Sequence, residues 1–523
     1  MYFHLTRLVP GGLLHGERDN TTRRYRVAHP EQALRLLESY RENFREEVVS
    51  RFVEVWGPLL PQRSRPGLPP AGTGRPRAGL NAPPRLPTPD MADEFDVIVV
   101  GAGMAGSAAA IRLAKGGANV LLLERGAEPG AKSLSGGILW GHDLDAIVPN
   151  WWHEMPIERH IIRKRFGFLT ADRALSFDFE DGDWKREPYV AHSVLRAKTD
   201  AWLAKKAEEA GATVVPSVPV DRLLWEGARV RGVAQEGESM TAPVTIVADG
   251  TNSRLSLGTP IRPNPHLSPE ATELGLKEVY QLDRGVIEDR FQVGPGEGHA
   301  EEWVTGMFAP GVYGGGFLYT NQDTVSLGLI VNIASLYGKN VYSQELVEQF
   351  KLHPTIAARL KGAELVEYGA KLISSGWASR PTAFHGDGWM VVGDAAGFVF
   401  SNGLVIQGMN YAIRSGILAA DTALEAVRAK DASAAGLAGY DRRLEASGIL
   451  ADFRDFERLD DVKWNPRIYT AYPKFATELF HAMMTETGAR KQPVRRLLKA
   501  ARKAAGLSTT RLARDGLNIY RRV

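Results

Sequence analysis

The 523-residue sequence contains no cysteine. It can therefore form no disulfide and supply no thiol nucleophile or thiolate ligand for an iron–sulfur cluster. It also lacks an uninterrupted apolar run long enough to span a bilayer. Residues 303–322 carry no charge, but Pro310 and five glycines interrupt them, so we expect strand and loop there. We recognise no secretory-signal pattern either.

An excess of one charge sign is also missing. The chain has 64 basic and 61 acidic residues, a formal net charge of +3. Duplex-binding proteins usually carry a concentrated basic face, so nucleic acid is not expected as the main partner. The length and the 44% hydrophobic content are typical of a globular protein with two or more domains.

The first 90 residues differ from the rest. Residues 1–56 form an N-terminal extension in which apolar residues from Ala33 to Val55 recur every three or four positions, which predicts one amphipathic helix. Residues 57–90 hold ten prolines, five arginines and one acid, which predicts a disordered linker. Two interpretations remain open: a tethered docking helix, or a protein that naturally starts at Met91.

A nucleotide-binding pattern begins at residue 95. The buried-strand run FDVIVV (95–100) leads directly into GAGMAG (101–106) and a helical stretch, and a second strand (119–123) ends at Glu124. Gly101 allows a tight turn, Gly103 allows backbone to approach a pyrophosphate, and Gly106 allows the helix to pack on the strand. The phosphates would meet the helix N-terminus, and Glu124 would bind an adenosine ribose.

Two later strands favour FAD over NAD. One (243–248) ends in Asp249-Gly250, and the other (389–392) ends in Gly393-Asp394. A lone carboxylate after a buried strand suits the ribityl hydroxyls that only FAD has. A helix starting near Gly408, Met409 and Asn410 would direct its N–H groups at the flavin ring. The alternative for Asp394 is a helix N-cap.

Several separated stretches carry a family resemblance. From about residue 93 onward, the chain resembles flavoproteins with a glutathione-reductase-type FAD domain, and more closely the FixC branch of the electron-transfer-flavoprotein:quinone oxidoreductases. The stretches, in family order, are GAGMAGSAAAIRLAKGG, LLLERGAEPGAKSLSGGILWG, HSVLRAKTDAWLAKKAEEAGA, LGLKEVYQL, YGGGFLYTN, EYGAKLISSGW and the segment from GDAAGF to GILAA.

The resemblance implies an α/β fold, α+β overall. A Rossmann-like FAD-binding domain of glutathione-reductase type would carry an inserted antiparallel-sheet domain for substrate or quinone, and a helical C-terminal region. We assign 91–175, 176–260 (with strands of the substrate domain) and 371–430 to the FAD-binding domain. Residues 261–370 would form the quinone domain, and 431–523 the helical, basic C-terminal region.

The resemblance also implies roles for individual residues. Gly101, Gly103, Gly106 and Glu124 would hold the ADP portion, and Arg125 and Arg196 would lie near the pyrophosphate or adenine. Asp394 would bind the ribityl chain. The flavin ring would be lined by Ser135, Gly136, Gly137, Ile138, Gly403 and Gly408.

No catalytic dyad or metal site is evident. Electron transfer requires the placement of redox centres more than acid–base chemistry by side chains, because the flavin itself carries the reactivity. His192 and His353 are conceivable proton donors to a quinone, but a lone histidine is more often a packed or capping residue. We therefore assign no catalytic residue.

The missing cysteines carry a further implication. Single-chain members of the wider family hold a four-iron cluster through C-terminal cysteines, whereas the FixC branch is expected to use a separate ferredoxin-like subunit beside two electron-transfer-flavoprotein subunits. The resemblance thus implies a FixABCX-type complex that reduces quinone at the inner face of the cell membrane and supplies low-potential electrons, for nitrogen fixation or another process. The chain would be cytoplasmic and peripherally membrane-associated. A geranylgeranyl-reductase-like enzyme and a non-catalytic flavin relay are the alternatives.

The end of the chain is basic. Residues 489–523 contain eleven Lys and Arg and one acid, Asp515, and Val494, Leu497, Leu498 and Ala501 recur at helical spacing. This pattern fits an interfacial helix on anionic lipid or a docking face for an acidic ferredoxin. A solvated basic tail is the simpler alternative.

Overall fold

The computed structural model describes residues 14–19, 22–27, 95–131, 136–306, 311–339, 341–374, 376–403 and 405–522. The chain separates into two units, residues 1–81 and 82–523. The first unit contains an antiparallel hairpin of β1 (Leu14–Asp19) and β2 (Thr22–Val27), which the sequence patterns did not suggest. The predicted helix after Ala33 and the linker at 57–90 lie outside the described residues.

The second unit is built on a six-stranded sheet with the order β19-β20-β13-β3-β4-β9. All neighbouring strands run parallel except β19 and β20. Its strands are β3 (Val97–Val100), β4 (Val120–Leu123), β9 (Thr213–Val215), β13 (Val244–Val247), β19 (His385–Gly386) and β20 (Trp389–Val391). The strands predicted near 95, 119, 243 and 389 are thus confirmed, and side by side they form the centre of the sheet.

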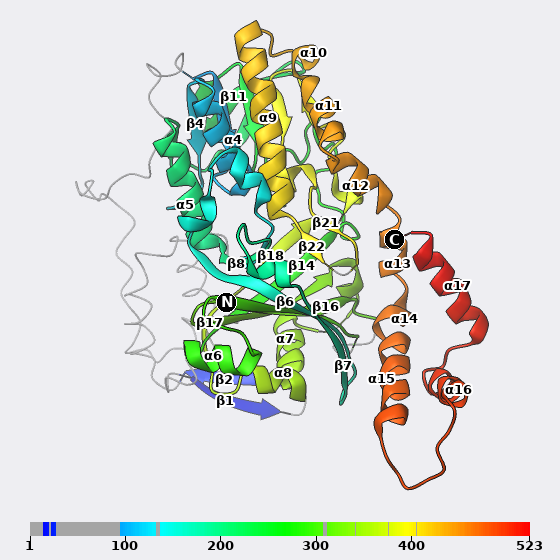
Figure 1. The fold of residues 1–523 in the computed structure, drawn as a ribbon. Helices are drawn as coiled ribbons and strands as arrows, with labels where there is room; N and C mark the ends of the chain where they lie inside the picture. Colours follow the sequence, from blue (N-terminus) through cyan, green and yellow to red (C-terminus); the bar gives the residue numbers. More distant parts are fainter. Residues whose placement is uncertain are drawn as a thin grey trace. The chain divides into compact units, whose positions relative to one another are not determined.

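Helices cover this sheet. Figure 1 shows α4 (Met104–Lys115) beside the long α9 (Met409–Ala429), and α5 (Arg196–Glu209) packs against α4. Ala108, Ala109 and Ala110 of α4 are fully buried, which lets the helix approach β3 and β4 closely. A three-stranded meander packs near β13 and consists of β10 (Arg222–Glu226), β11 (Arg229–Gln235) and β12 (Glu238–Thr241).

The second large sheet of this unit has nine strands. Its main path is β18-β14-β17-β16-β15-β6-β8-β5, and β7 pairs with β6. The sheet is mixed rather than purely antiparallel, because β6 and β15 run parallel. Its strands are β5 (Gly136–Leu139), β6 (Ile157–Leu169), β7 (Ala174–Glu180), β8 (His192–Leu195), β14 (Thr272–Gln281), β15 (Glu297–Val304), β16 (Gly314–Thr320), β17 (Thr324–Asn332) and β18 (Glu364–Ser374). Strands β5 and β6 and the start of β7 lie within residues 91–175, which we assigned to the first part of the FAD-binding domain. They belong to this second sheet instead.

The two faces of this sheet differ. Successive residues of a strand point to opposite faces. Leu276, Trp303 and Leu318 belong to a hydrophobic cluster with residues of α6 (Arg284–Phe291), α7 (Ser343–Leu352) and α8 (Pro354–Arg359). The alternate positions, which include Lys277 and Tyr319, are therefore on the face turned away from these helices.

The C-terminal region is helical, as predicted. Its helices are α10 (Ala434–Leu437), α11 (Gly439–Ala446), α12 (Ile449–Asp455), α13 (Leu459–Lys463), α14 (Pro466–Tyr469), α15 (Ala471–Met484), α16 (Val494–Ala504) and α17 (Thr509–Tyr520). They run as a column along one side of the unit (Figure 1), where α15 contacts β6 and β7. None of the helices in the part of the chain that the structure describes combines the length and apolar character that a membrane crossing requires.

Short elements complete the unit. A two-residue ladder joins β21 (Phe400–Ser401) to β22 (Ile406–Gln407). The single-turn 3₁₀ helices are η4 (His142–Ala146), η5 (Trp151–His153), η6 (Gly182–Lys185), η7 (Ala334–Leu336), η8 (Trp377–Ser379) and η9 (Gly393–Ala396).

Candidate cofactor and substrate site

The glycines in the turn between β3 and α4 have two different roles. A Cβ on Gly101, whose φ is +106°, would lie 2.4 Å from the carbonyl oxygen of Ala248, and a Cβ on Gly106 would lie 1.9 Å from that of Gly101. The protein's own packing thus requires both glycines. A Cβ on Gly103 would meet only Arg196 Nη2, at 3.4 Å. The space beside Gly103 is therefore open for a ligand at the N-terminus of α4, where an anion is favoured.

Glu124 closes this turn from β4. Its Oε2 accepts a hydrogen bond from the backbone N–H of Ala102 at 3.0 Å, and its Oε1 accepts one from Gly126 at 2.6 Å. The carboxylate is therefore held beside the glycine turn, the place predicted for an adenosine ribose. The next residue, Arg125, is exposed, and its charge lies near Asp249.

Arg196 places a fixed cation over the turn. At the start of α5, its guanidinium binds both carboxylate oxygens of Asp200, at 2.7 and 2.8 Å. Although burial disfavours the charge, Asp200 and the nearby Asp394 raise the pKa of Arg196 above its usual range. The structure thus brings Arg196 near both Gly103 and Asp394, a suitable position for binding a pyrophosphate.

Asp249 and Arg262 each have a buried polar atom without a hydrogen-bond partner among the described residues. Asp249 Oδ2 accepts a hydrogen bond from Leu255 N–H at 3.0 Å, while its buried Oδ1 has no partner among the described residues. Burial raises the pKa of Asp249 to about 6. Arg262, which was not predicted, donates to the carbonyl of Ala395 at 2.7 Å, and its Nε is also unpartnered in the described part of the chain. Such orphaned atoms are typical of a site completed by a ligand.

Asp394 is not a helix N-cap in this structure. It lies within η9, which begins at Gly393 without a side-chain cap, and α9 begins later with Gly408 at its N-cap position. Asp394 Oδ2 accepts a hydrogen bond from Thr251 Oγ1 at 3.3 Å, and Gly393 N–H donates to Ser415 Oγ at 3.0 Å. A Cβ on Gly408 would lie 3.7 Å from Asp394 Oδ1. The carboxylate therefore lies at the start of α9, and the N-cap alternative does not hold.

The start of α9 also meets the predicted flavin loop. A Cβ on Gly137 would lie 3.3 Å from Met409 Cε, so β5 and the α9 N-terminus are adjacent. Asn410 donates a side-chain hydrogen bond to Gln407 Oε1 at 3.1 Å. Ser135, the remaining predicted residue of the flavin loop, lies outside the described residues.

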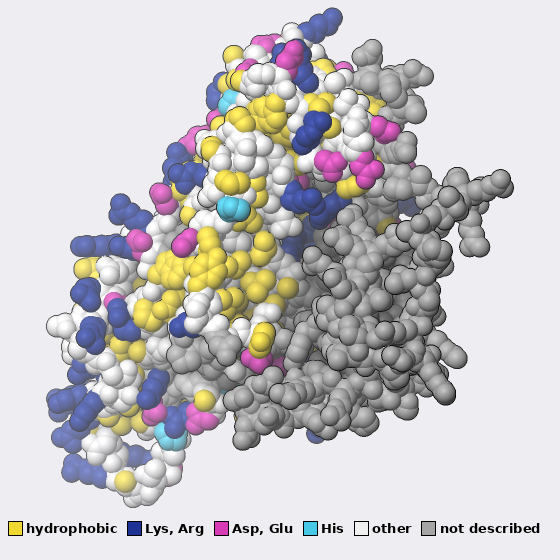
Figure 2. Space-filling model, turned by 180° about the vertical axis from the view of Figure 1, so that it is seen from behind, with side chains coloured by type: hydrophobic (Ala, Val, Ile, Leu, Met, Phe, Trp, Pro, Cys, Tyr) yellow, Lys and Arg dark blue, Asp and Glu magenta, His cyan; other side chains and the backbone are white. Residues whose placement is uncertain are grey.

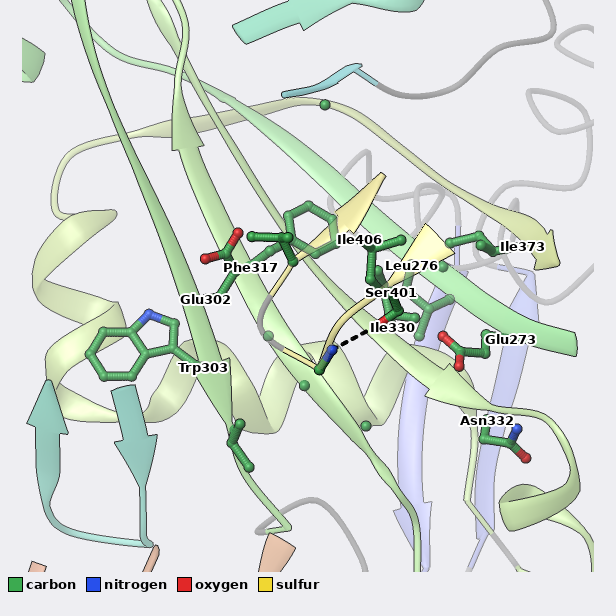
Figure 3. Close-up of a pocket in the computed structure, with 18 of the residues that line it drawn as sticks. Glu273, Leu276, Glu302, Trp303, Phe317, Ile330, Asn332, Ile373, Ser401 and Ile406 are labelled. Atoms are coloured by element: carbon green, nitrogen blue, oxygen red, sulfur yellow. Dashed lines mark hydrogen bonds between the residues drawn. The ribbon is translucent and has the colours of Figure 1, made fainter. Parts of the chain in front are cut away.

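A cavity of about 450 Å³ joins the predicted cofactor residues to the large sheet. Gly136, Gly137, Ile138, Asp394 and Gly403 line it together. Figure 3 shows its wall of sheet residues, with Ser401 and Ile406 from the β21–β22 hairpin, where Gly403 N–H donates to Ser401 Oγ at 3.2 Å. The structure adds lining residues that the sequence did not single out: Lys164, Lys277, Glu302, Phe317, Tyr319, Lys371, Trp464 and Tyr469. Four of them lie in the LGLKEVYQL, YGGGFLYTN and EYGAK stretches, which were the available signal.

The two histidines considered as proton donors do not line this cavity. His192 is fully buried, with its Nδ1 3.0 Å from His160 Nδ1, and burial lowers its pKa to about 3. His353 accepts a hydrogen bond from Thr355 N–H at 3.2 Å and caps α8. Both are packing or capping residues, as expected for lone histidines. No group of three or more metal-binding side chains occurs within the described ranges.

Three family models match the chain. They are "FAD dependent oxidoreductase" over residues 96–182, "ETF-QO, ubiquinone-binding" over 272–373, and "ETF-QO/FixC family C-terminal domain" over 462–523. The first covers the glycine turn and β4, and the second covers the strands β14 to β18 that wall the cavity. The predicted FAD cofactor is thus confirmed, and the open side of Gly103, Arg196 and Asp394 fit it.

Curated relatives match over most of their length. The chain is 38% identical to the probable electron transfer flavoprotein-quinone oxidoreductase YdiS of Escherichia coli K12, over 81% of this chain and 98% of that protein. It is 39% identical to protein FixC of Salmonella typhi with the same coverages, and 36% identical to protein FixC of Azotobacter vinelandii over 78% and 94%.

Solved structures share the fold at low identity. A geranylgeranyl bacteriochlorophyll reductase-like protein of Thermoplasma acidophilum aligns with a TM-score of 0.59 and 20% identity, over 81% of this chain and 99% of that one. The halogenase PltM in complex with phloroglucinol and FAD aligns with a TM-score of 0.53 and 16% identity, over 82% and 91%. At these identities the likeness shows the fold alone.

Proposed function

Because the chain belongs to the family of FixC and the electron transfer flavoprotein-quinone oxidoreductases, we propose that it transfers electrons from an electron-transfer flavoprotein to a quinone. It is a FAD-dependent oxidoreductase of this type. The observation that carries the proposal is the shared cavity. Gly136, Gly137, Ile138 and Asp394 line it on one side, and the strands of the ubiquinone-binding model line it on the other.

The chain's own residues then have distinct tasks. Gly103 and Arg196 bind the pyrophosphate, Glu124 the adenosine ribose and Asp394 the ribityl chain. Bound FAD supplies reversible exchange of one or two electrons, chemistry that the side chains lack. The mostly apolar wall of the cavity keeps water from the electron-transfer site, and its polar groups orient the substrate.

The complex is inferred from the missing cysteines. A thiolate-bound cluster on the path of the electrons must belong to another polypeptide. We therefore propose a FixABCX-type assembly with two electron-transfer-flavoprotein subunits and a ferredoxin-like subunit. It would supply low-potential electrons, and nitrogen fixation is one process that uses them.

The C-terminal helices offer a surface for peripheral membrane contact. Figure 2 shows Lys and Arg side chains along the edge that these helices form, with hydrophobic side chains beside them. On α16, Val494 and Leu498 are exposed, whereas Ala501 is buried where α16 packs on α15. Only part of the predicted apolar stripe is therefore free to contact lipid. Co-sedimentation with vesicles of anionic and of neutral lipid tests this contact. If the chain does not sediment with anionic vesicles but is retained by an immobilised acidic ferredoxin-like subunit, the membrane contact is overturned.

Reconstitution tests the main proposal. The full chain is mixed with electron-transfer flavoprotein, a ferredoxin-like subunit and a short-chain quinone, and quinone reduction is followed by absorbance. We expect reduction that depends on all three protein components. Saturation of a geranylgeranyl lipid by the isolated chain with a simple reductant, and no response to these partners, would instead support a prenyl reductase. Electron exchange between partners without any quinone reduction would support a flavin relay.

A further inference from the structure

Lys277 is a buried lysine without a counter-charge. It lies on β14 and only 5% of it is exposed. Its Nζ has no hydrogen bond or ion pair among the described residues. Burial lowers the pKa of Lys277 to about 7, and the acids that oppose this shift, Glu367 and Glu158, make no contact with it. Glu158 is already bound by Lys198, at 2.7 Å.

Such a side chain is costly for folding alone. An unpaired buried amine or ammonium loses its hydration without replacement. Lys164, another lysine of the cavity lining, behaves differently, because its Nζ lies 2.7 Å from Glu302. Lys277 is also flanked by glycines in both neighbouring strands, Gly328 on β17 and Gly369 on β18. No side chain from these positions can shield or bind it.

The surroundings of Lys277 form a polar corner in an apolar wall. Its Nζ lies 5.2 Å from the centroid of the Tyr319 ring, and the Tyr319 hydroxyl is buried beside Ser326. Phe317 stacks on Tyr319 at 5.8 Å between centroids. All three residues line the cavity. A planar ligand that carries an oxygen could lie against these rings with the oxygen toward Lys277.

The charges near Lys277 differ from those near the predicted cofactor contacts, although Phe317 and Tyr319 share a hydrophobic cluster with Ile138 of the predicted flavin loop. Lys371, on the neighbouring strand, has its electrostatic neighbours in Arg196, Asp394 and Asp200. The neighbours of Lys277 are Glu367 and Glu158 instead. Lys371 therefore lies near the predicted cofactor residues, whereas Lys277, whose opposite residue on β18 is Gly369, has none of them among its charged neighbours.

We propose that Lys277 Nζ donates a hydrogen bond to a carbonyl oxygen of the quinone, whose ring lies against Phe317 and Tyr319. The inference rests on the proposed function and assigns a binding residue to it. Negative charge grows on that oxygen as the quinone is reduced, so the contact strengthens during the reaction.

Three variants of the full, FAD-loaded chain test the contact. Lys277→Met removes the donor at similar volume, Lys277→Arg keeps a donor, and Lys205→Met removes an exposed lysine of α5 as the matched control. Quinone binding is measured by perturbation of the flavin absorbance. Quinone KM and kcat are measured with reduced electron-transfer flavoprotein, and ferricyanide serves as an acceptor that needs no binding corner.

We expect Lys277→Met to weaken quinone binding and raise its KM by about 10- to 100-fold, the range for a lost hydrogen bond to a charged donor. FAD content and the rate of ferricyanide reduction should stay within about twofold of the wild type. The flavin potential should not shift. Lys277→Arg should recover part of the loss, and Lys205→Met should match the wild type.

Other outcomes separate the alternatives. An unchanged quinone affinity in Lys277→Met would overturn the inference. A shifted flavin potential with unchanged affinity would overturn it too and place Lys277 against the flavin. If the wild type binds quinone through Lys277 but does not reduce it, the contact stands and the proposed function fails. If the wild type binds no quinone, both fail.

Discussion

Replacing the second and the third glycine of the turn separately should distinguish cofactor binding from folding. Gly103→Ala and Gly103→Leu add a side chain where only the flexible end of Arg196 lies near, at 3.4 Å. Gly106→Ala adds a methyl group 1.9 Å from the backbone oxygen of Gly101, which cannot move without opening the turn. The Gly103 variants should therefore fold and lose FAD, whereas Gly106→Ala should lose stability even without FAD.

The magnitudes follow from these contacts. At an N-cap position, glycine to alanine costs about 1 kcal/mol or less. Forced overpacking costs about 1–3 kcal/mol and occasionally more. With an unfolding entropy of about 2 cal/mol/K per residue, a unit of this size shifts its Tm by roughly 1 °C per kcal/mol. FAD at about 100 times its Kd adds about 2.7 kcal/mol to the wild type, hence roughly 3 °C.

The assay is thermal unfolding of apo-protein with and without added FAD, together with the flavin absorbance of purified protein. In Gly103→Leu we expect an apo Tm within about 1 °C of wild type and no increase on adding FAD. Gly106→Ala should unfold about 1–3 °C lower in both conditions. Full flavin occupancy and a normal FAD-induced increase in Gly103→Leu would refute the assignment of Gly103 to the pyrophosphate.

Three further predictions concern other parts of the chain. A protein starting at Met91 should keep one FAD per chain by absorbance, because the nucleotide-binding strand begins at Val97; flavin-free protein would show that residues 1–90 support the fold. Purified protein should contain no iron by elemental analysis, because it offers no thiolate; stoichiometric iron would contradict this. Lys277→Met should be more stable than wild type by about 4 kcal/mol at pH 7 and about 1 kcal/mol at pH 10. The unfolded chain binds more protons than the folded one between pH 7 and 10.5, so wild-type stability rises across this window; an equal gain at both pH values would show that the pKa of Lys277 is not lowered.

Several elements could be predicted because their signals are local. Strands β3, β4, β13 and β20 are short apolar runs that end at a glycine or an acid, and α9 follows a glycine-rich loop. The GAGMAG turn joins strand to helix with glycines at the positions where Ala248 and Gly101 come too close for a side chain. Chain-local spacing was enough for these elements, and family order in the motifs then identified the cofactor.

Other features had no local signal. The β1–β2 hairpin has no pattern that stood out, and the parallel pairing of β6 with β15 joins segments far apart in the chain. Arg262 could not be recognised as a site residue, because its contact with Ala395 exists only once β13 and β20 lie side by side.

The sequence by itself thus determined the nucleotide-binding turn from residue types at short spacing, the FAD cofactor from the order of its motifs, and the absence of thiolate ligands from its composition. Only the tertiary structure decided that Asp394 faces the start of α9 rather than capping a helix. It alone left Lys277 without a partner beside Tyr319. Burial and pairing of a side chain depend on which distant strands become neighbours and in which register, and no short stretch of sequence contains that information.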